Sequence, residues 1–326
     1  MYGRKPRRMS ALLLFAAALR VLPGVCANAA LCAPELAELS RMALVLSVGA
    51  AQAEPEKKPQ VWVLHVLPKP EREEPKEKLV FTADEAEKLA VSGNSGKEFD
   101  KAALLCAPAA FSVAADAPAV LIVHAHTSEA YTQSAGWTYV ESDPLRTAER
   151  EYSVLRVGEE LRRTLEERGI RTLHDGSVND RPDYNAAYAR CGARTETLLA
   201  EHPSVQVVLD VHRDAAEDAQ GRQTGQTVPA DGEDAARLML VVGTDAGGRE
   251  HPGWQKNLSL ALKLQALGER RVPGLFRPID LRRERFNQQL SPGALLVEVG
   301  AAGNTLPEAL AGARIFASLL AELLQG

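Results

Sequence analysis

The stretch VLIVHAHTSEAY, residues 120–131, contains the pattern on which the fold prediction rests. Four apolar residues, VLIV, end at His124, and His126 and Glu129 follow closely. A short, continuous apolar run of this kind predicts a strand that is buried on both faces of a sheet. The chain has seven histidines, and two of them directly after a buried strand single out this strand end as a candidate site.

Similar strands alternate with helices along the rest of the chain. Apolar residues at helical spacing predict a helix over 153–169, which Gly169 ends. The other predicted strands are 170–175, 205–214, 236–245 and 294–304, and the other predicted helices are 184–202, 254–270 and 306–325. This alternation predicts an α/β fold, a mostly parallel sheet with helices on both faces. Binding and catalytic sites of such sheets form at the carboxyl ends of the strands.

The N-terminal part of the chain has a different composition. Residues 1–53 begin with a basic stretch followed by apolar runs, which predicts a signal or membrane-anchor segment with the rest of the chain outside the cytoplasm. The sequence leaves open whether this segment is cleaved. Residues 54–80 are rich in Pro, Glu and Lys, which is typical of a linker. Residues 81–326 form the α/β domain, which we expect to be catalytic.

Composition argues against nucleic acid as a partner. The net charge is −5 and the basic residues are interleaved with acidic ones, so no basic domain exists to bind phosphates. Aromatic residues make up 5% of the chain, too few to indicate a base-stacking surface. The four cysteines, Cys26, Cys32, Cys106 and Cys191, have no zinc-knuckle spacing.

Polar residues gather where the predicted strands end. His124 and His126 follow the first strand, His212 lies in VLDVHRD, and Glu298 interrupts the apolar run LLVEVG. Two or three histidines with a carboxylate are the usual ligands of a catalytic zinc ion. Glu298 is a candidate general base, because an acid within a strand core is costly unless it has a partner or a function. The alternative is that each histidine is an ordinary strand-end residue with its hydrogen bonds satisfied.

Six separated motifs together resemble the stage II sporulation protein P family. They occur in the order VLIVHAHTSEAY, EYSVLRVGEELRRTLEERGI, HDGSVNDRPDYNAAYAR, VVLDVHRDA, MLVVGTDAGGREHPGWQKNLSLALKLQ and PGLFRPIDLRRERFNQQLSPGALLVEVGAAGNTLPEA, within residues 98–325. The resemblance implies a membrane-anchored cell-wall hydrolase similar to zinc-dependent N-acetylmuramoyl-L-alanine amidases. It implies peptidoglycan as the substrate, a role in septal thinning and engulfment, and stage II sporulation proteins D and M as partners.

The resemblance also assigns roles to individual residues. His126 or His124, together with Glu149 and His212, would bind Zn²⁺, and Glu298 would activate water. Glu149 is chosen because it lies four residues before Ser153, where the helix is expected to begin. A rival scheme replaces Glu149 by Glu129, which follows His126 by three residues.

Three further residues have weaker assignments. Arg213 is expected either to hold a substrate carboxylate or developing oxyanion, or to form a salt bridge with a neighbouring aspartate. Asn287 is expected to line the substrate cleft, and Asn304 matches an asparagine that trails the catalytic glutamate in the amidases.

Two other functions remain open at the level of sequence. A peptidoglycan-binding module of the same fold that does not cleave its ligand would be expected to lack at least one of these residues. A zinc carboxypeptidase acting on stem peptides would need Glu129 as a ligand and an arginine placed for the terminal carboxylate.

Overall fold

A computed structural model describes residues 79–110, 113–114 and 116–326. The chain divides into two units, 1–71 and 72–326, and the described residues belong to the second. The predicted anchor segment, the linker up to residue 78, Cys26 and Cys32 lie outside the described residues. None of the helices that the structure describes has the length and apolar character needed to span a membrane.

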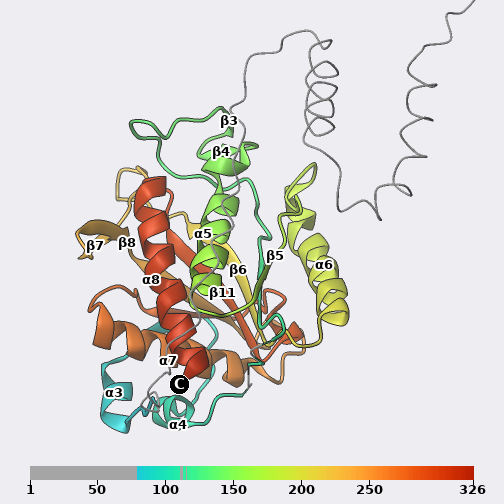
Figure 1. The fold of residues 1–326 in the computed structure, drawn as a ribbon, viewed down its shortest axis with the longest axis vertical. Coiled ribbons are helices and arrows are strands. Elements are labelled where there is room, and N and C mark those ends of the chain that lie inside the picture. Colours follow the sequence, from blue (N-terminus) through green and yellow to red (C-terminus); the bar gives the residue numbers. More distant parts are fainter. Residues whose placement is uncertain (1–78, 111–112, 115) are drawn as a thin grey trace, which may run out of the picture. The chain divides into compact units, whose positions relative to one another are not determined.

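The centre of the described part is a seven-stranded sheet (Figure 1). Its strands, in spatial order, are β1 (Val91–Gly93), β10 (Ile279–Arg282), β9 (Leu238–Gly243), β11 (Gly293–Ala301), β6 (Val207–Asp214), β2 (Val120–Val123) and β5 (Thr172–His174). Every neighbouring pair is parallel except β9 and β11, which are antiparallel. The prediction of an α/β fold with a mostly parallel sheet is therefore confirmed.

Helices cover both faces of this sheet. Helices α5 (Val154–Glu167), α7 (Trp254–Arg271) and α8 (Leu306–Gln325) share one large apolar core with the sheet. Helix α6 (Ala187–Glu201) packs on a separate, smaller cluster that contains Leu121 and Val208. Figure 1 shows α6 apart from the other three. We refer to the two sides as the α5/α7/α8 face and the α6 face.

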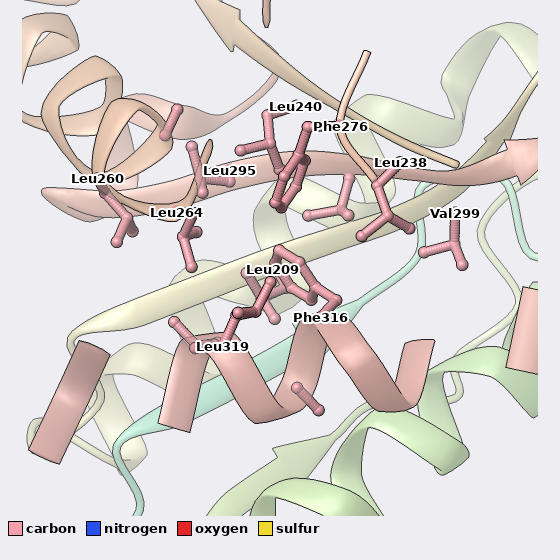
Figure 2. Packing of buried hydrophobic residues seen from close by; sticks show 14 of the residues in the cluster. Leu209, Leu238, Leu240, Leu260, Leu264, Phe276, Leu295, Val299, Phe316 and Leu319 are labelled. Carbon is pink, nitrogen blue, oxygen red and sulfur yellow. The ribbon is translucent and has the colours of Figure 1, made fainter. Parts of the chain in front are cut away.

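The larger core explains why α8 closes the fold. Phe316 is fully buried and meets Phe276 edge-on, with 6.4 Å between the ring centroids. Figure 2 shows both rings among the leucines of β9, β11 and α7. The helix starts at Thr305, which forms a capping box with Glu308, so local sequence and tertiary burial agree on where α8 begins.

Several short elements were not predicted from the sequence. Helices α3 (Ala83–Lys88) and α4 (Lys101–Cys106) pack with α7, and the hairpins β3 (Glu141–Asp143)–β4 (Arg146–Thr147) and β7 (Thr227–Ala230)–β8 (Glu233–Ala236) lie outside the sheet. The 3₁₀ turns are η3 (Arg150–Tyr152), η4 (Tyr184–Ala186) and η5 (Gln288–Leu290). Strands β1 and β10 were also missed, because three or four residues are too few to show a hydrophobic period.

Candidate active site

Three neighbouring parallel strands bring the candidate residues to one edge of the sheet. Strand β6 pairs with β2 on one side and with β11 on the other, and His212 and Glu298 are direct partners in the β6–β11 register. Side chains alternate between the faces of a strand, so Asp210 and His212 lie on the same face. Cys191 of α6 packs in the cluster that contains Val208, which places these side chains on the α6 face.

His212 lies between two carboxylates. Its side chain is buried, its Nδ1 atom is 3.3 Å from Oε2 of Glu129, and its Nε2 atom is 2.9 Å from Oδ1 of Asp210. The second contact lacks hydrogen-bond geometry, and Oδ1 of Asp210 already accepts a hydrogen bond from the Ala125 amide. Burial alone would lower the pKa of His212, but the charges of Asp210 and Glu129 outweigh it and raise the pKa well above its usual range.

Glu298 is the second unusual carboxylate of the site. Its Oε2 atom is buried and has no hydrogen-bond partner. Burial, reinforced by the charge of Glu129, raises the pKa of Glu298 to about 8. A carboxyl group in this state is poised to exchange a proton near neutral pH, as a general acid or base requires.

His126 completes the cluster and is enclosed by aromatic rings. Its ring is stacked on Tyr184, with centroids 4.2 Å apart, and it meets Tyr188 and His212 edge-on at 5.3 and 5.5 Å. The Nδ1 atom is buried without a hydrogen-bond partner. Burial lowers the pKa of His126, so the ring favours the neutral form that can bind a metal or accept a proton.

His124 faces the other side of the sheet. Its Nδ1 atom donates to the Val211 carbonyl at 2.9 Å, and its Nε2 atom is 2.9 Å from Nε2 of His174. The two rings lie against Gly158 of α5, where a Cβ would come within 2.5 Å of His124. Both ring nitrogens of His124 are thus occupied away from His212, and we remove His124 from the candidate metal ligands.

Glu129, and not Glu149, lies beside the histidines. The Glu129 carbonyl accepts from the amide of Val154, so this residue sits at the start of α5 in space. The Glu149 carboxylate instead accepts a hydrogen bond from the Val140 amide at 2.7 Å. Residues 132–152 form an excursion that contains the hairpin β3–β4, so counting backwards from the helix does not indicate which glutamate contacts His212. We correct the proposed carboxylate from Glu149 to Glu129.

The remaining predicted residues have structural contacts. Arg213 is buried, donates from Nε to the Ala130 carbonyl and from Nη2 to the Leu145 carbonyl, and its amide donates to Glu129. Neither the expected ion pair with Asp210 or Asp214 nor a free guanidinium is seen among the described residues. Arg213 therefore holds the loop that carries Glu129.

The two asparagines also bind the backbone. The Asn304 side chain accepts from the Ala301 amide and donates to Gln226 and Glu308, which fixes the turn after β11. Asn287 has a left-handed backbone conformation and donates to the Tyr188 carbonyl at 2.8 Å. Asn287 thus reaches the site only through Tyr188, and Asn304 lies in a structural turn.

Sequence reasoning missed Tyr184, Tyr188 and Asp180. Asp180 accepts hydrogen bonds from the Thr127 hydroxyl and from both the amide and the hydroxyl of Ser128, and so anchors the loop between His126 and Glu129. The motif YNAAY places the two tyrosines four residues apart, which puts them on one side of a helical segment. That spacing was the only signal available for them.

The donor types of this cluster fit zinc. His126 presents a buried Nδ1 atom without a hydrogen bond, and Nδ1 of His212 faces the Glu129 carboxylate at 3.3 Å. Nitrogen and carboxylate oxygen are ligands that Zn²⁺ accepts. Within residues 79–326, apart from the three that are not described, no group of three or more His, Cys, Asp or Glu side chains is already arranged to hold a metal ion.

The fold and the site define an α/β protein with a buried histidine–carboxylate centre at the carboxyl ends of parallel strands. The sequence model described as Stage II sporulation protein P (SpoIIP) matches residues 43–321. This chain therefore belongs to the stage II sporulation protein P family. It is 26% identical over 219 residues to Stage II sporulation protein P of Bacillus subtilis (strain 168), across 64% of this chain and 51% of that protein. The chain thus spans about half the length of that curated relative.

Solved amidase structures have a distant likeness to this fold. The N-acetylmuramyl-L-alanine amidase Ami1 from Mycobacterium smegmatis gives a TM-score of 0.34 at 14% identity, across 64% of this chain and 95% of that chain. The CwlD amidase from Clostridioides difficile, solved in complex with the GerS lipoprotein, gives a TM-score of 0.35 at 12% identity, across 64% of this chain and 95% of that chain.

Proposed function

We propose that this chain is a zinc-dependent peptidoglycan hydrolase that cleaves the amide between N-acetylmuramic acid and L-alanine. The observation that carries the proposal is the meeting of His212 on β6, Glu298 on the neighbouring β11 and Glu129 in the loop after β2. A buried histidine between carboxylates, next to a carboxyl group with a raised pKa, is an arrangement that structural residues rarely need. Family membership supports a role in sporulation, and the sequence resemblance supports the amidase chemistry.

His126, His212 and Glu129 would hold the metal. Bound there, zinc would polarise the substrate carbonyl as a Lewis acid. The Asp210 carboxylate lies at Nε2 of His212, on the side opposite Glu129, and the Arg213 amide fixes the Glu129 carboxylate.

Glu298 is the proposed proton carrier. Its Oε2 atom takes a proton from the attacking water as the new C–O bond forms at the lactyl carbonyl carbon. The same atom then delivers the proton to the alanine nitrogen when the C–N bond breaks. The raised pKa of Glu298 suits both halves of this cycle, because the group must gain the proton as readily as it loses it.

The wider role follows from the family and the N-terminal sequence. We propose that the chain is anchored in the membrane and acts outside the cytoplasm, between the mother-cell and forespore membranes, during septal thinning and engulfment. Stage II sporulation proteins D and M are the proposed partners, and cleavage of peptide cross-links is a proposed additional activity.

A zinc carboxypeptidase is the second candidate, and the position of Glu129 favours it. Such an enzyme also needs an arginine for the terminal carboxylate of its substrate. The Arg213 guanidinium is bound to two backbone carbonyls, so it is not available for this purpose.

The test uses the full chain in detergent, incubated with peptidoglycan sacculi with and without zinc. Glu298→Ala is the inactive control, and mass spectrometry identifies the products. Release of intact stem peptides that depends on both zinc and Glu298 is the expected result. Release of terminal D-alanine alone would establish the carboxypeptidase, and binding to sacculi without any product would indicate a binding module.

A further inference from the structure

A cavity of about 580 Å³ lies next to the candidate active site on the other side of Tyr188. Tyr188 lines this cavity, and its ring is also stacked with that of His212 at 6.2 Å and nearly parallel, at 13°. Phe286 forms a second aromatic wall, 5.6 Å from Tyr188 between ring centroids. The volume lies in the range of small-molecule and peptide sites. Asn287, which the sequence predicts to line the substrate cleft, also lines this cavity. The metal-binding and proton-transfer roles proposed above do not use it.

The loops at residues 243–249 and 282–287 are hydrogen-bonded to each other and form the wall of the cavity opposite α6. The Gly247 amide donates to the Arg283 carbonyl at 2.8 Å, and the Thr244 hydroxyl donates to the Arg282 carbonyl at 2.9 Å. A Cβ at Gly243 would lie 2.3 Å from the Glu284 carbonyl, so the loops are in close contact. One backbone hydrogen bond and one bond from the Thr244 hydroxyl therefore hold the wall, and neither uses the side chain of a residue that lines the cavity.

Three arginines, Arg249, Arg283 and Arg285, line this cavity. The guanidinium groups of Arg249 and Arg283 make no hydrogen bond or ion pair with any residue described in the structure. Arg285 donates from Nη1 to the Glu250 carbonyl, but its Nε atom is buried without a partner. Glu284 is the acidic residue of the lining, and Arg282 pairs with it at 3.4 Å. The cavity therefore has an excess of positive charge and unused donors.

We propose that this cavity binds the free carboxylates of a peptide, namely the stem peptide of the substrate. Guanidinium groups bind carboxylates with two parallel hydrogen bonds, and the aromatic walls contact aliphatic side chains. In peptidoglycan the lactyl carboxyl group is an amide, so the free carboxylates belong to the peptide. This inference rests on the proposed function, since it assigns the peptide side of the scissile amide to the cavity beside Tyr188.

The test measures binding of a synthetic, linear stem peptide that carries free carboxylates. This peptide contains no muramoyl amide, so the wild-type full chain can be used without turnover of that bond. Titration with a fluorescently labelled peptide gives the dissociation constant, and a peptide with its carboxylates converted to amides is the matched ligand. The double variant Arg249→Ala/Arg283→Ala is compared with Arg171→Ala, a change at another exposed arginine near the start of β5.

We expect the double variant to bind the carboxylate peptide at least about tenfold more weakly, since bonds to charged groups are lost. The amidated peptide should bind wild type as weakly as the carboxylate peptide binds the double variant. Arg171→Ala should leave the dissociation constants of both peptides at their wild-type values. On a muramoyl-peptide substrate the double variant should raise KM by a similar factor with little change in kcat. Equal affinities for the two peptides, or for wild type and the double variant, would overturn the proposal.

These outcomes separate the cavity from the reaction. If sacculi remain intact but peptide binding needs the arginines, the proposed hydrolase activity is wrong and the assignment of the cavity stands. If sacculi are cleaved but neither the arginines nor the carboxylates affect binding, the cavity assignment alone fails. Inorganic phosphate as a competitor checks whether any anion is bound. If phosphate displaced the labelled peptide at concentrations close to that of the peptide, the assignment to peptide carboxylates would be overturned.

Discussion

The Oε2 atom of Glu129 lies 3.3 Å from Nδ1 of His212 and accepts a hydrogen bond from the Arg213 amide at 3.2 Å. One carboxylate oxygen therefore connects the loop after β2 to the end of β6. Burial favours the uncharged form of both groups. The contact nevertheless helps to raise the pKa of His212 and to lower the pKa of Glu129. Each group thus favours the charged form of the other in a buried setting, where such pairing matters most.

The position of Glu129 predicts that this residue, and not Glu149, is essential. Glu129→Gln keeps the shape of the side chain but removes the negative charge beside His212. We expect a loss of peptidoglycan hydrolysis of about 100-fold and weaker zinc binding. Glu149→Gln should stay within about threefold of wild type, because a hydrogen bond to an exposed amide contributes little.

Hydrolysis of sacculi and zinc competition with a coloured chelator are the measurements for this pair. Circular dichroism checks that both variants are folded. Loss of activity in Glu149→Gln, with Glu129→Gln active, would restore the assignment based on spacing along the chain.

Gly158 should be intolerant of any side chain. A Cβ at this position would lie 2.5 Å from Nε2 of His124 and 2.6 Å from Nε2 of His174. Because both rings are wedged between α5 and the sheet, Gly158→Ala should lower the free energy of unfolding by about 1–3 kcal/mol. Urea denaturation is the measurement. Gly253→Ala, where nothing lies within 4 Å, is the control and should change stability by less than about 0.5 kcal/mol.

The raised pKa of Glu298 predicts a dependence of stability on pH in protein freed of metal by a chelator. The pKa is about 8 in the folded chain and 4.5 is its ordinary value. Between these values the folded chain keeps a proton that the unfolded chain has released. The stabilising contribution is thus fully present below the lower value and is lost as the pH rises through about 8.

Glu298→Gln does not titrate, so it should escape this loss. Its melting temperature relative to wild type should rise by roughly 5 °C between about pH 6 and about pH 9. Thermal denaturation in the presence of chelator measures the difference, and Glu151→Gln, at an exposed position, is the control. A difference that stays constant over this pH range would show that Glu298 does not hold a proton in the folded chain.

Phe316 should be among the most sensitive positions of the core. Its ring is fully buried between α8 and the sheet and contacts Phe276 (Figure 2). Phe316→Ala should lower the free energy of unfolding by about 3–5 kcal/mol, because a cavity replaces a large apolar group. Leu323→Ala, near the end of the same helix and only partly buried, should cost clearly less in the same urea titration. Equal losses would mean that α8 is held along its whole length and not chiefly at Phe316.

Much of this architecture follows from local sequence. The buried strands at 120–123, 207–214 and 293–301 contain continuous apolar runs. The helices between and after them have hydrophobic periods, and α5 and α8 begin at capping residues. The parallel arrangement follows from the alternation of strands and helices. The sequence also predicts that His126, His212 and Glu298 share one edge, because they lie at strand ends.

The tertiary structure decided which of the neighbouring polar residues face each other. His124 and His126 are equivalent in sequence, but the pleat of β2 directs His124 toward Gly158 and α5. Glu149 lies close before α5 along the chain and Glu129 lies farther back, but the path of the hairpin β3–β4 brings Glu129 to His212.

Chain direction in the outer half of the sheet was also not determined locally. The strands β9, β10 and β1 run opposite to β11, and nothing in their residues states this. Hydrophobic periods depend on neighbours along the chain, so the sequence determined the elements and the types of chemical group at their ends. Contacts between residues 80 or more positions apart, such as Glu129 with His212, depend on how those elements pack, so only the tertiary structure decided the site.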